Sequence, residues 1–132
     1  MDYQRDEQQV HLMVNPLIWC PKRRRKVLVN QIGTRCDELI RQKCDENGWT
    51  ILELTVQPDH VHLFVRVWPS VSAADVVKEC KGFSAFTLRK EFPELHRLPS
   101  LWTRSYFAST AGNIGNVRSE TIQRSSEAQS RQ

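Results

Sequence analysis

The centre of the chain alternates apolar and polar residues in two consecutive segments, 49–57 and 60–67. In the second segment one side of the alternation is wholly apolar, with Val61, Leu63, Val65 and Val67. The other side carries His60, His62, Phe64 and Arg66. In the first segment the apolar set is Leu52, Leu54 and Val56. Successive strand residues point to opposite faces, so the pattern predicts two strands that each bury one face. Pro58-Asp59 between them is typical of a tight turn.

Two other segments repeat their apolar residues every three or four positions, which predicts helices. The first covers about residues 26–47, with the stripe Ile32, Cys36, Leu39, Ile40 and Cys44. Gly48 follows it, where a left-handed C-terminal cap is expected. The second reaches about residue 91 and is stopped by Pro93, while Ser72 and Asp75 form a capping-box pattern at its start.

The outer segments complete the predicted fold. Residues 10–20 and 101–110 read as strands, and Pro16 places an edge or a bulge in the first of them. A connector at 112–117 precedes a C-terminal helix at about 118–130. The order strand–helix–strand–strand–helix–strand predicts an α+β, ferredoxin-like split βαβ fold. We expect a four-stranded antiparallel sheet with two helices on one face, the other face being left free.

Length and composition are those of a small globular protein. The chain has 132 residues, of which 39% are hydrophobic and 26% charged, so we expect a single domain with a core over about residues 8–111. There is no apolar run of about 18 residues and no secretory signal, which predicts an intracellular, cytoplasmic protein without membrane association. The four cysteines form no Cys-x-x-Cys pair, which argues against structural zinc and disulfides. Cys36 and Cys44 fall on an apolar helix stripe, which favours a packing role for these two.

Positive charge is concentrated in one run. The net charge is +4, and five consecutive cations occupy Lys22, Arg23, Arg24, Arg25 and Lys26. Such a run serves as a solvated face, a localisation signal or a phosphate contact, and its composition alone leaves the three open. Phe64 lies on the free sheet face, where an aromatic ring either stacks on a base or has no role. Lys81 is predicted to be a solvated helix residue.

His60 and His62 are candidate metal ligands. Residues i and i+2 of a strand lie on the same side about 6.5–7 Å apart, so two imidazoles converge on one ion. Two ligands leave coordination positions open, as a catalytic metal requires. The packing face of this strand is supplied by its other residues, so the histidines are free for another role. Two histidines that face solvent or make local hydrogen bonds remain the alternative.

Several motifs together resemble the small insertion-sequence transposases of the HUH single-tyrosine class, which mobilise DNA as single strands. The motifs are Trp19-Cys20-Pro21 with the basic run, Pro58-Asp59-His60-Val61-His62-Leu63, Lys81-Gly82-Phe83-Ser84, Leu101-Trp102 and Ser105-Tyr106-Phe107. The Pro-Asp-His-Val-His-Leu segment is the most specific of them. The resemblance covers about residues 18–129.

The resemblance implies a homodimer that recognises hairpins at the ends of single-stranded DNA. A tyrosine attacks the scissile phosphate to give a 5′-phosphotyrosine, and rejoining reverses the step. His60, His62 and Gln129 are implied to hold Mg²⁺ or Mn²⁺, which polarises and orients the phosphate. The resemblance also implies that the basic run and Lys81 contact DNA.

The chain departs from the family at the nucleophile. Gln129 is in register with the family motif Tyr-x-x-x-Gln, but Ser125 occupies the tyrosine position. Four explanations stay open: a cleavage-dead protein, attack by Tyr106 or Tyr3, attack by Ser125 itself, and a misaligned tail. Asn15-Pro16 is a second departure, in a strand where relatives carry an aromatic residue and a histidine.

Two other classes of function fit the same sequence. A non-catalytic module that binds single-stranded nucleic acid would use the same sheet and basic run without chemistry. A metal-storage or metal-sensing domain would use the two histidines without DNA.

Overall fold

The structure is a computed structural model that describes residues 12–108 of the chain. The strands are β1 (Leu12–Trp19), β2 (Thr50–Gln57), β3 (His60–Val67) and β4 (Phe107–Ala108). The helices are α2 (Asn30–Glu46) and α3 (Ala73–Glu91), with short 3₁₀ helices η1 (Lys22–Arg24) and η2 (Pro93–Arg97). The expected connector and C-terminal helix, residues 112–130, lie outside the described residues.

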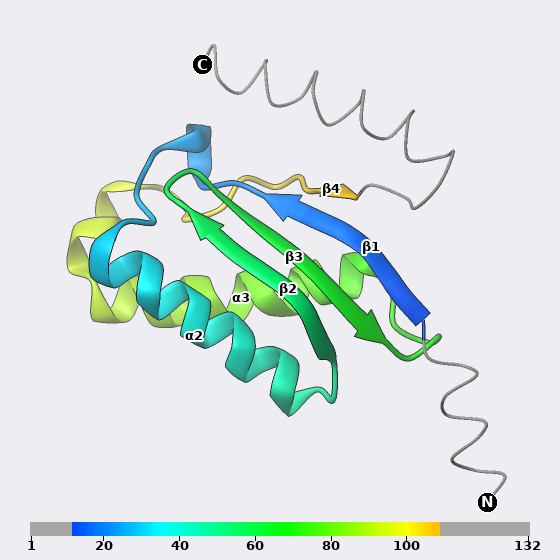
Figure 1. The fold of residues 1–132 in the computed structure, drawn as a ribbon. Helices are drawn as coiled ribbons and strands as arrows, with labels where there is room; N and C mark the ends of the chain where they lie inside the picture. The colour runs from blue at the N-terminus through cyan, green and yellow to red at the C-terminus, as the bar shows by residue number, and fades with distance from the viewer. Residues whose placement is uncertain (1–11, 109–132) are drawn as a thin grey trace, which may run out of the picture.

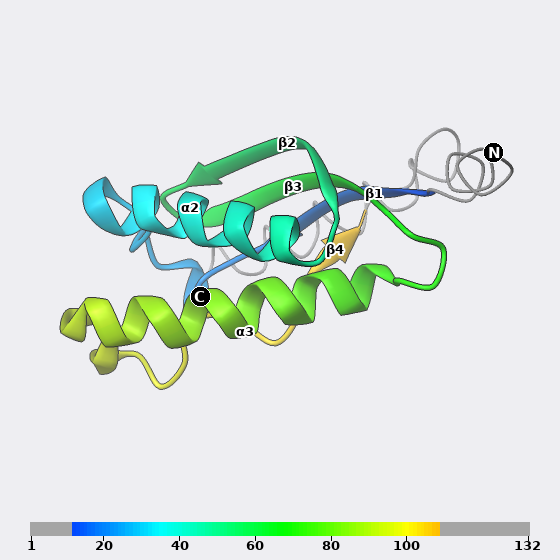
Figure 2. The same ribbon diagram turned by 90° about the horizontal axis from the view of Figure 1, so that it is seen from below.

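The four strands form one sheet in the order β2-β3-β1-β4, and each neighbouring pair is antiparallel. β3 therefore lies between β1 and β2, and β1 lies between β3 and β4, which is the split βαβ arrangement. In the part of the chain that the structure describes, both long helices lie on the same face of this sheet (Figures 1 and 2). The predicted fold class is confirmed.

The core lies between the sheet and the two helices. The four apolar residues of β3 (Val61, Leu63, Val65 and Val67) are fully buried, as the alternation predicts. The predicted stripe of α2 is buried against them, together with Val76, Val77, Cys80 and Leu88 of α3. All four cysteines are buried free thiols, and Cys36 and Cys44 pack in the core as predicted.

The helices begin and end as their local signals predict. Ser72 Oγ accepts a hydrogen bond from the Asp75 backbone, and the Asp75 carboxylate accepts one from the Ser72 backbone, so the capping box is complete. Gly48 adopts φ 74° after α2. Arg35 in α2 binds Glu91 in α3 through two hydrogen bonds of 2.8 and 3.0 Å, which joins the start of one helix to the end of the other. None of the described helices is long and apolar enough to cross a membrane.

The first helix begins later than predicted, at Asn30 and not at Lys26. Val27 and Leu28 are buried in a non-helical segment, and the Leu28 amide donates a hydrogen bond to the Pro58 carbonyl (3.0 Å). Because this bond joins segments far apart in sequence, helical periodicity could not reveal it. The segment links the basic turn to the β2–β3 turn.

Bulges alter two strands. The pairing of β2 with β3 shifts between Ile51 and Glu53, so Leu52 is 39% exposed and Ile51 packs against the core in its place. The prediction that Leu52 points inward is therefore wrong. The pairing of β1 with β3 shifts between Val14 and Leu17, and β1 lies between β3 and β4. Of the two alternatives predicted at Pro16, an edge or a bulge, the structure therefore has the bulge.

The last described strand is shorter than predicted. Within residues 101–108, only Phe107–Ala108 pair with β1, and Trp102 forms an isolated bridge with Pro21. Much of the intervening segment bonds to α3 instead of to the sheet, as described below. Residues 109 and 110 of the predicted strand lie outside the described part.

Candidate metal and nucleic-acid site

The histidine pair projects from the sheet face that the long helices do not cover. Burial along β3 alternates strictly, and His60 and His62 both fall on the partly exposed side. His62 lies directly opposite Thr55 of β2 and Ile18 of β1, while His60 lies opposite Gln57. Because the valines supply the core, neither imidazole is needed for packing. The sequence-based expectation of two rings on one open face agrees with this geometry.

Asp59 holds the first histidine from the preceding turn. The distance between Asp59 Oδ1 and His60 Nδ1 is 2.9 Å. The other carboxylate oxygen, Oδ2, lies 3.2 Å from an Nη atom of Arg24. Partial burial alone would raise the pKa of the Asp59 carboxyl, but the His60 hydrogen bond and the Arg24 charge outweigh it, so the pKa lies below its usual value. Asp59 therefore connects the basic turn to the histidine strand.

The basic run is divided by the way its backbone folds. Arg23 and Arg24 both adopt left-handed conformations, with φ of 58° and 53°. The Arg24 side chain is 19% exposed and turns toward Asp59. Arg23, Arg25 and Lys26 are exposed, and Lys22 is partly exposed. Four of the five predicted DNA-contacting cations thus remain accessible beside the histidines, while Arg24 is engaged within the protein.

The same face carries two aromatic side chains. Phe64 is partly exposed on β3, opposite Glu53. Phe107 of β4 lies opposite Ile18, which in turn lies opposite His62, so the three residues form one row across the sheet. Phe107 belongs to the family motif Ser105-Tyr106-Phe107, but the sequence did not predict a position for it on the open face. The signal that could have found it is the alternation with Tyr106 and Ala108, which both pack on the core side.

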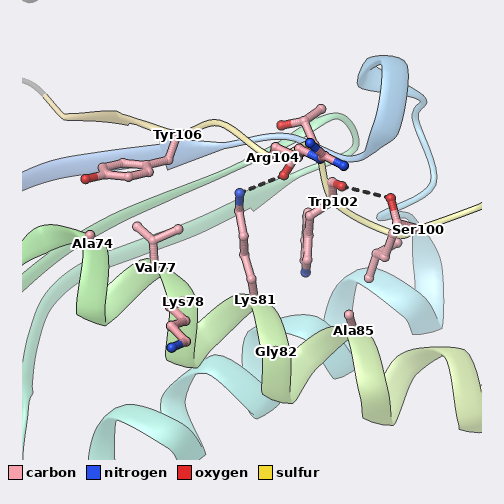
Figure 3. A pocket seen from close by; sticks show the side chains of 12 residues that line it. Ala74, Val77, Lys78, Lys81, Gly82, Ala85, Ser100, Trp102, Arg104 and Tyr106 are labelled. Carbon is pink, nitrogen blue, oxygen red and sulfur yellow. Dashed lines mark hydrogen bonds between the residues drawn. The ribbon is translucent and has the colours of Figure 1, made fainter.

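Lys81 lies on the helix side of the sheet, in a cavity of about 450 Å³ between α3 and residues 100–106 (Figure 3). Its ammonium donates hydrogen bonds to the carbonyls of Thr103 (2.7 Å) and Ser105 (2.9 Å). Burial lowers the pKa of Lys81 to about 8. The prediction that Lys81 is simply solvated is wrong, because the segment that carries these carbonyls folds back onto the helix.

Tyr106 lies in the same cavity, above Ala74 and Val77 of α3 (Figure 3). Its ring packs against the core, on the opposite side of the sheet from His60 and His62. This position argues against Tyr106 as an alternative nucleophile. Tyr3, Ser125 and Gln129 lie outside the described residues.

The donor chemistry at the histidines fits a divalent ion that needs further ligands. Two imidazoles on one face supply nitrogen donors and leave positions open. Within residues 12–108, no group of three His, Cys, Asp or Glu side chains is placed to hold a metal ion. A complete site therefore requires another donor, and Gln129 is the residue that the family resemblance implies.

The fold and the histidine motif define the class of protein, and the chain belongs to the IS200-like transposase family: the family model "Transposase IS200 like" matches residues 9–124. A curated relative, the ISDra2 transposase TnpA of Deinococcus radiodurans, is 34% identical over 116 residues, which cover 86% of this chain and 81% of the relative. The transposase of insertion sequence IS200 of Salmonella typhimurium is 26% identical over 73% of this chain and 65% of its own length.

Solved structures agree with this assignment. A crystal structure assigned as a transposase of Deinococcus radiodurans R1 matches with a TM-score of 0.76 and 33% identity, over 90% of this chain and 91% of that chain. A REP-associated tyrosine transposase bound to a REP hairpin has the same fold, with a TM-score of 0.52 and 14% identity, over 83% and 64% of the two chains. The resemblance drawn from the sequence motifs is confirmed at the level of the family.

Proposed function

We propose that this chain binds hairpin-bearing single-stranded DNA together with a divalent metal ion, and that it has lost the cleavage step of its family. The observation that carries the proposal is the placement of His60 and His62 on one open sheet face beside the basic turn. His60, His62 and Gln129 are the proposed ligands, and Mg²⁺ or Mn²⁺ the proposed ion. When bound, such an ion polarises a scissile phosphate and fixes its orientation.

The residues around the histidines would position the DNA. The exposed cations Arg23, Arg25 and Lys26, with Lys22, provide a positive surface for the phosphate backbone at the end of the sheet where His60 lies. Phe64 supplies an aromatic ring for base stacking on the same face. Arg24 and Lys81 are less suited to contact DNA, because both are bonded within the protein.

Ser125 at the tyrosine position supports the loss of cleavage. The family resemblance implies that the nucleophile is the phenol of a tyrosine, which is more acidic than the hydroxyl of a serine. An aliphatic hydroxyl attacks a phosphate only with the help of a base or a strongly activating metal. We propose that the chain acts as a homodimer, as the family resemblance implies. The runner-up is a nucleic-acid-binding module that needs no metal at all.

A labelled hairpin-bearing DNA strand separates these possibilities. We expect a mobility shift that is strengthened by Mn²⁺ and no covalent adduct on a denaturing gel. A covalent adduct formed by the unaltered chain would show that cleavage survives. A shift of the same affinity with and without Mn²⁺, and no Mn²⁺ uptake by calorimetry, would favour the metal-free module.

The double variant His60→Ala/His62→Ala tests the ligands directly. It should lose Mn²⁺ binding and keep the circular dichroism of the wild type, because neither ring contributes to the core. His96→Ala is the matched control, since His96 is exposed in η2 and lies outside the strand that carries the histidine pair. Collapse of the double variant would assign the two histidines a structural role.

A further inference from the structure

Asp59 lies between His60 and Arg24 and contacts both side chains. One carboxylate oxygen lies 2.9 Å from His60 Nδ1, and the other lies 3.2 Å from the Arg24 guanidinium. The three side chains are largely shielded, with exposed fractions of 30% for His60, 23% for Asp59 and 19% for Arg24. The contacts are therefore formed where competition from water is reduced.

The contact between Asp59 and His60 determines which ring nitrogen carries the proton. An ionised carboxylate only accepts hydrogen bonds, so the 2.9 Å contact requires a proton on His60 Nδ1. In the neutral ring this leaves the Nε2 lone pair free. A metal ion needs such a lone pair, and a carboxylate behind a ligand histidine is a common way to fix its tautomer and ring orientation.

We propose that Asp59 is a positioning residue, which holds His60 as the Nδ1–H tautomer and directs Nε2 toward the ion on the open face. This inference rests on the proposed metal site. Asp59 acts through His60 and is not itself a ligand, because one carboxylate oxygen contacts His60 Nδ1 and the other contacts the Arg24 guanidinium.

Arg24 completes the arrangement from the basic turn. Its left-handed backbone is unfavourable for a residue with a side chain, and such a conformation persists only where several contacts hold it. The Arg24 amide donates to the Pro21 carbonyl (2.8 Å), and the Arg25 amide donates to the Lys22 carbonyl (3.2 Å). These bonds fix the turn so that Arg24 faces Asp59. Arg24 is therefore assigned to Asp59 and not to a DNA phosphate.

The test compares Asp59→Ala with Asp37→Ala in the full-length protein. Asp37 is a matched control, because its carboxylate also bonds an arginine (Arg41, 2.6 Å) but lies on α2. The first readout is the ¹⁵N NMR tautomer state of His60 in the metal-free protein, at about pH 8.5, where an ordinary histidine is neutral. We expect Nδ1–H in the wild type and in Asp37→Ala, and a shift toward Nε2–H in Asp59→Ala.

The second readout is Mn²⁺ affinity by calorimetry. Asp59→Ala should bind about 10–100-fold more weakly, the usual effect of removing a residue behind a metal ligand. Unchanged affinity, or an Nε2–H tautomer in the wild type, would overturn the inference. Complete loss of binding, equal to that of His62→Ala, would overturn it in another way by making Asp59 a ligand. If the wild type shows the Nδ1–H tautomer but binds no Mn²⁺, the proposed metal function fails and the tautomer assignment does not.

Arg24→Met separates the arginine from the carboxylate. Removal of the charge should weaken Mn²⁺ binding less than Asp59→Ala does. DNA affinity measured without metal should stay within about twofold of the wild type, whereas Arg25→Met, which removes an exposed cation of the proposed DNA surface, should lower it. The opposite result would be a loss of DNA affinity in Arg24→Met as large as that in Arg25→Met, with Mn²⁺ binding intact. It would show that Arg24 contacts DNA and would overturn its assignment to Asp59.

Discussion

The indole Nε1 of Trp102 donates a hydrogen bond to Ser84 Oγ across 3.1 Å. Both side chains are buried, at 6% and 0% exposure. Ser84 also donates to the Cys80 carbonyl one turn earlier in α3 (2.6 Å). Together with the bonds of Lys81 to Thr103 and Ser105, this contact attaches segment 101–105 to the helix. The Lys81-Gly82-Phe83-Ser84 motif thus anchors the chain that leads to β4.

We expect Ser84→Ala to reduce the free energy of unfolding by about 1–3 kcal/mol, because it leaves the buried indole N–H without its acceptor. Urea denaturation followed by tryptophan fluorescence measures the change. Ser70→Ala, in an exposed turn, is the control and should stay within about 0.5 kcal/mol. Equal effects of the two substitutions would mean that the indole finds another partner.

Lys81 predicts a pH dependence of stability. Its pKa is about 8 in the folded protein against 10.5 for an ordinary lysine, so between these values the unfolded chain binds more protons. The Lys81 contribution to stability therefore rises as the pH increases from about 8 to 10.5. The slope is at most about 1.4 kcal/mol per pH unit, and solvent screening of this half-buried amine reduces it.

Lys81→Met should remove that contribution. The wild type minus variant difference in unfolding free energy is expected to increase across this pH window. The neighbouring Cys20 thiol, whose pKa burial raises to about 11, acts in the opposite direction but is present in both proteins. A difference that is flat with pH would show that the Lys81 ammonium is as well solvated when folded as when unfolded.

Two helical glycines should respond oppositely to alanine. An added Cβ at Gly82 in α3 meets nothing within 4 Å, so Gly82→Ala should stabilise the protein by about 0.5–1 kcal/mol through helix propensity. At Gly33 in α2 the same atom would lie 2.7 Å from the Leu28 carbonyl oxygen. Gly33→Ala should therefore destabilise the protein by about 1–3 kcal/mol. Thermal unfolding of both variants provides the comparison, and stabilisation by Gly33→Ala would contradict the close backbone approach.

Ser125→Tyr tests whether the nucleophile is the missing part of the site. With Mn²⁺ and a labelled hairpin-bearing strand, this variant should form a covalent protein–DNA adduct that the wild type does not form. Ser125→Phe adds the same ring without the hydroxyl and should remain inert. If Ser125→Tyr also stays inert while it binds Mn²⁺ and DNA, the loss of activity extends beyond this residue.

Local patterns in the sequence determined much of this protein. The alternation of β3 assigned His60 and His62 to the open face, because the pleat of a strand follows directly from residue order. The capping box at Ser72 and the left-handed Gly48 were equally predictable, because a helix terminus depends on residues close in sequence. The strand and helix order then led to the split βαβ topology.

The tertiary structure alone decided how several candidate residues are used. Arg24 bonds Asp59, Lys81 bonds Thr103 and Ser105, and Phe107 joins the row of His62. Each of these relationships joins segments more than 20 residues apart. Each depends on how the chain turns or on how two strands are aligned, which is set only when the two segments pack together. A basic run or a helical lysine has the same local pattern whether it faces solvent or a buried partner. Only the packing of distant segments distinguishes the two.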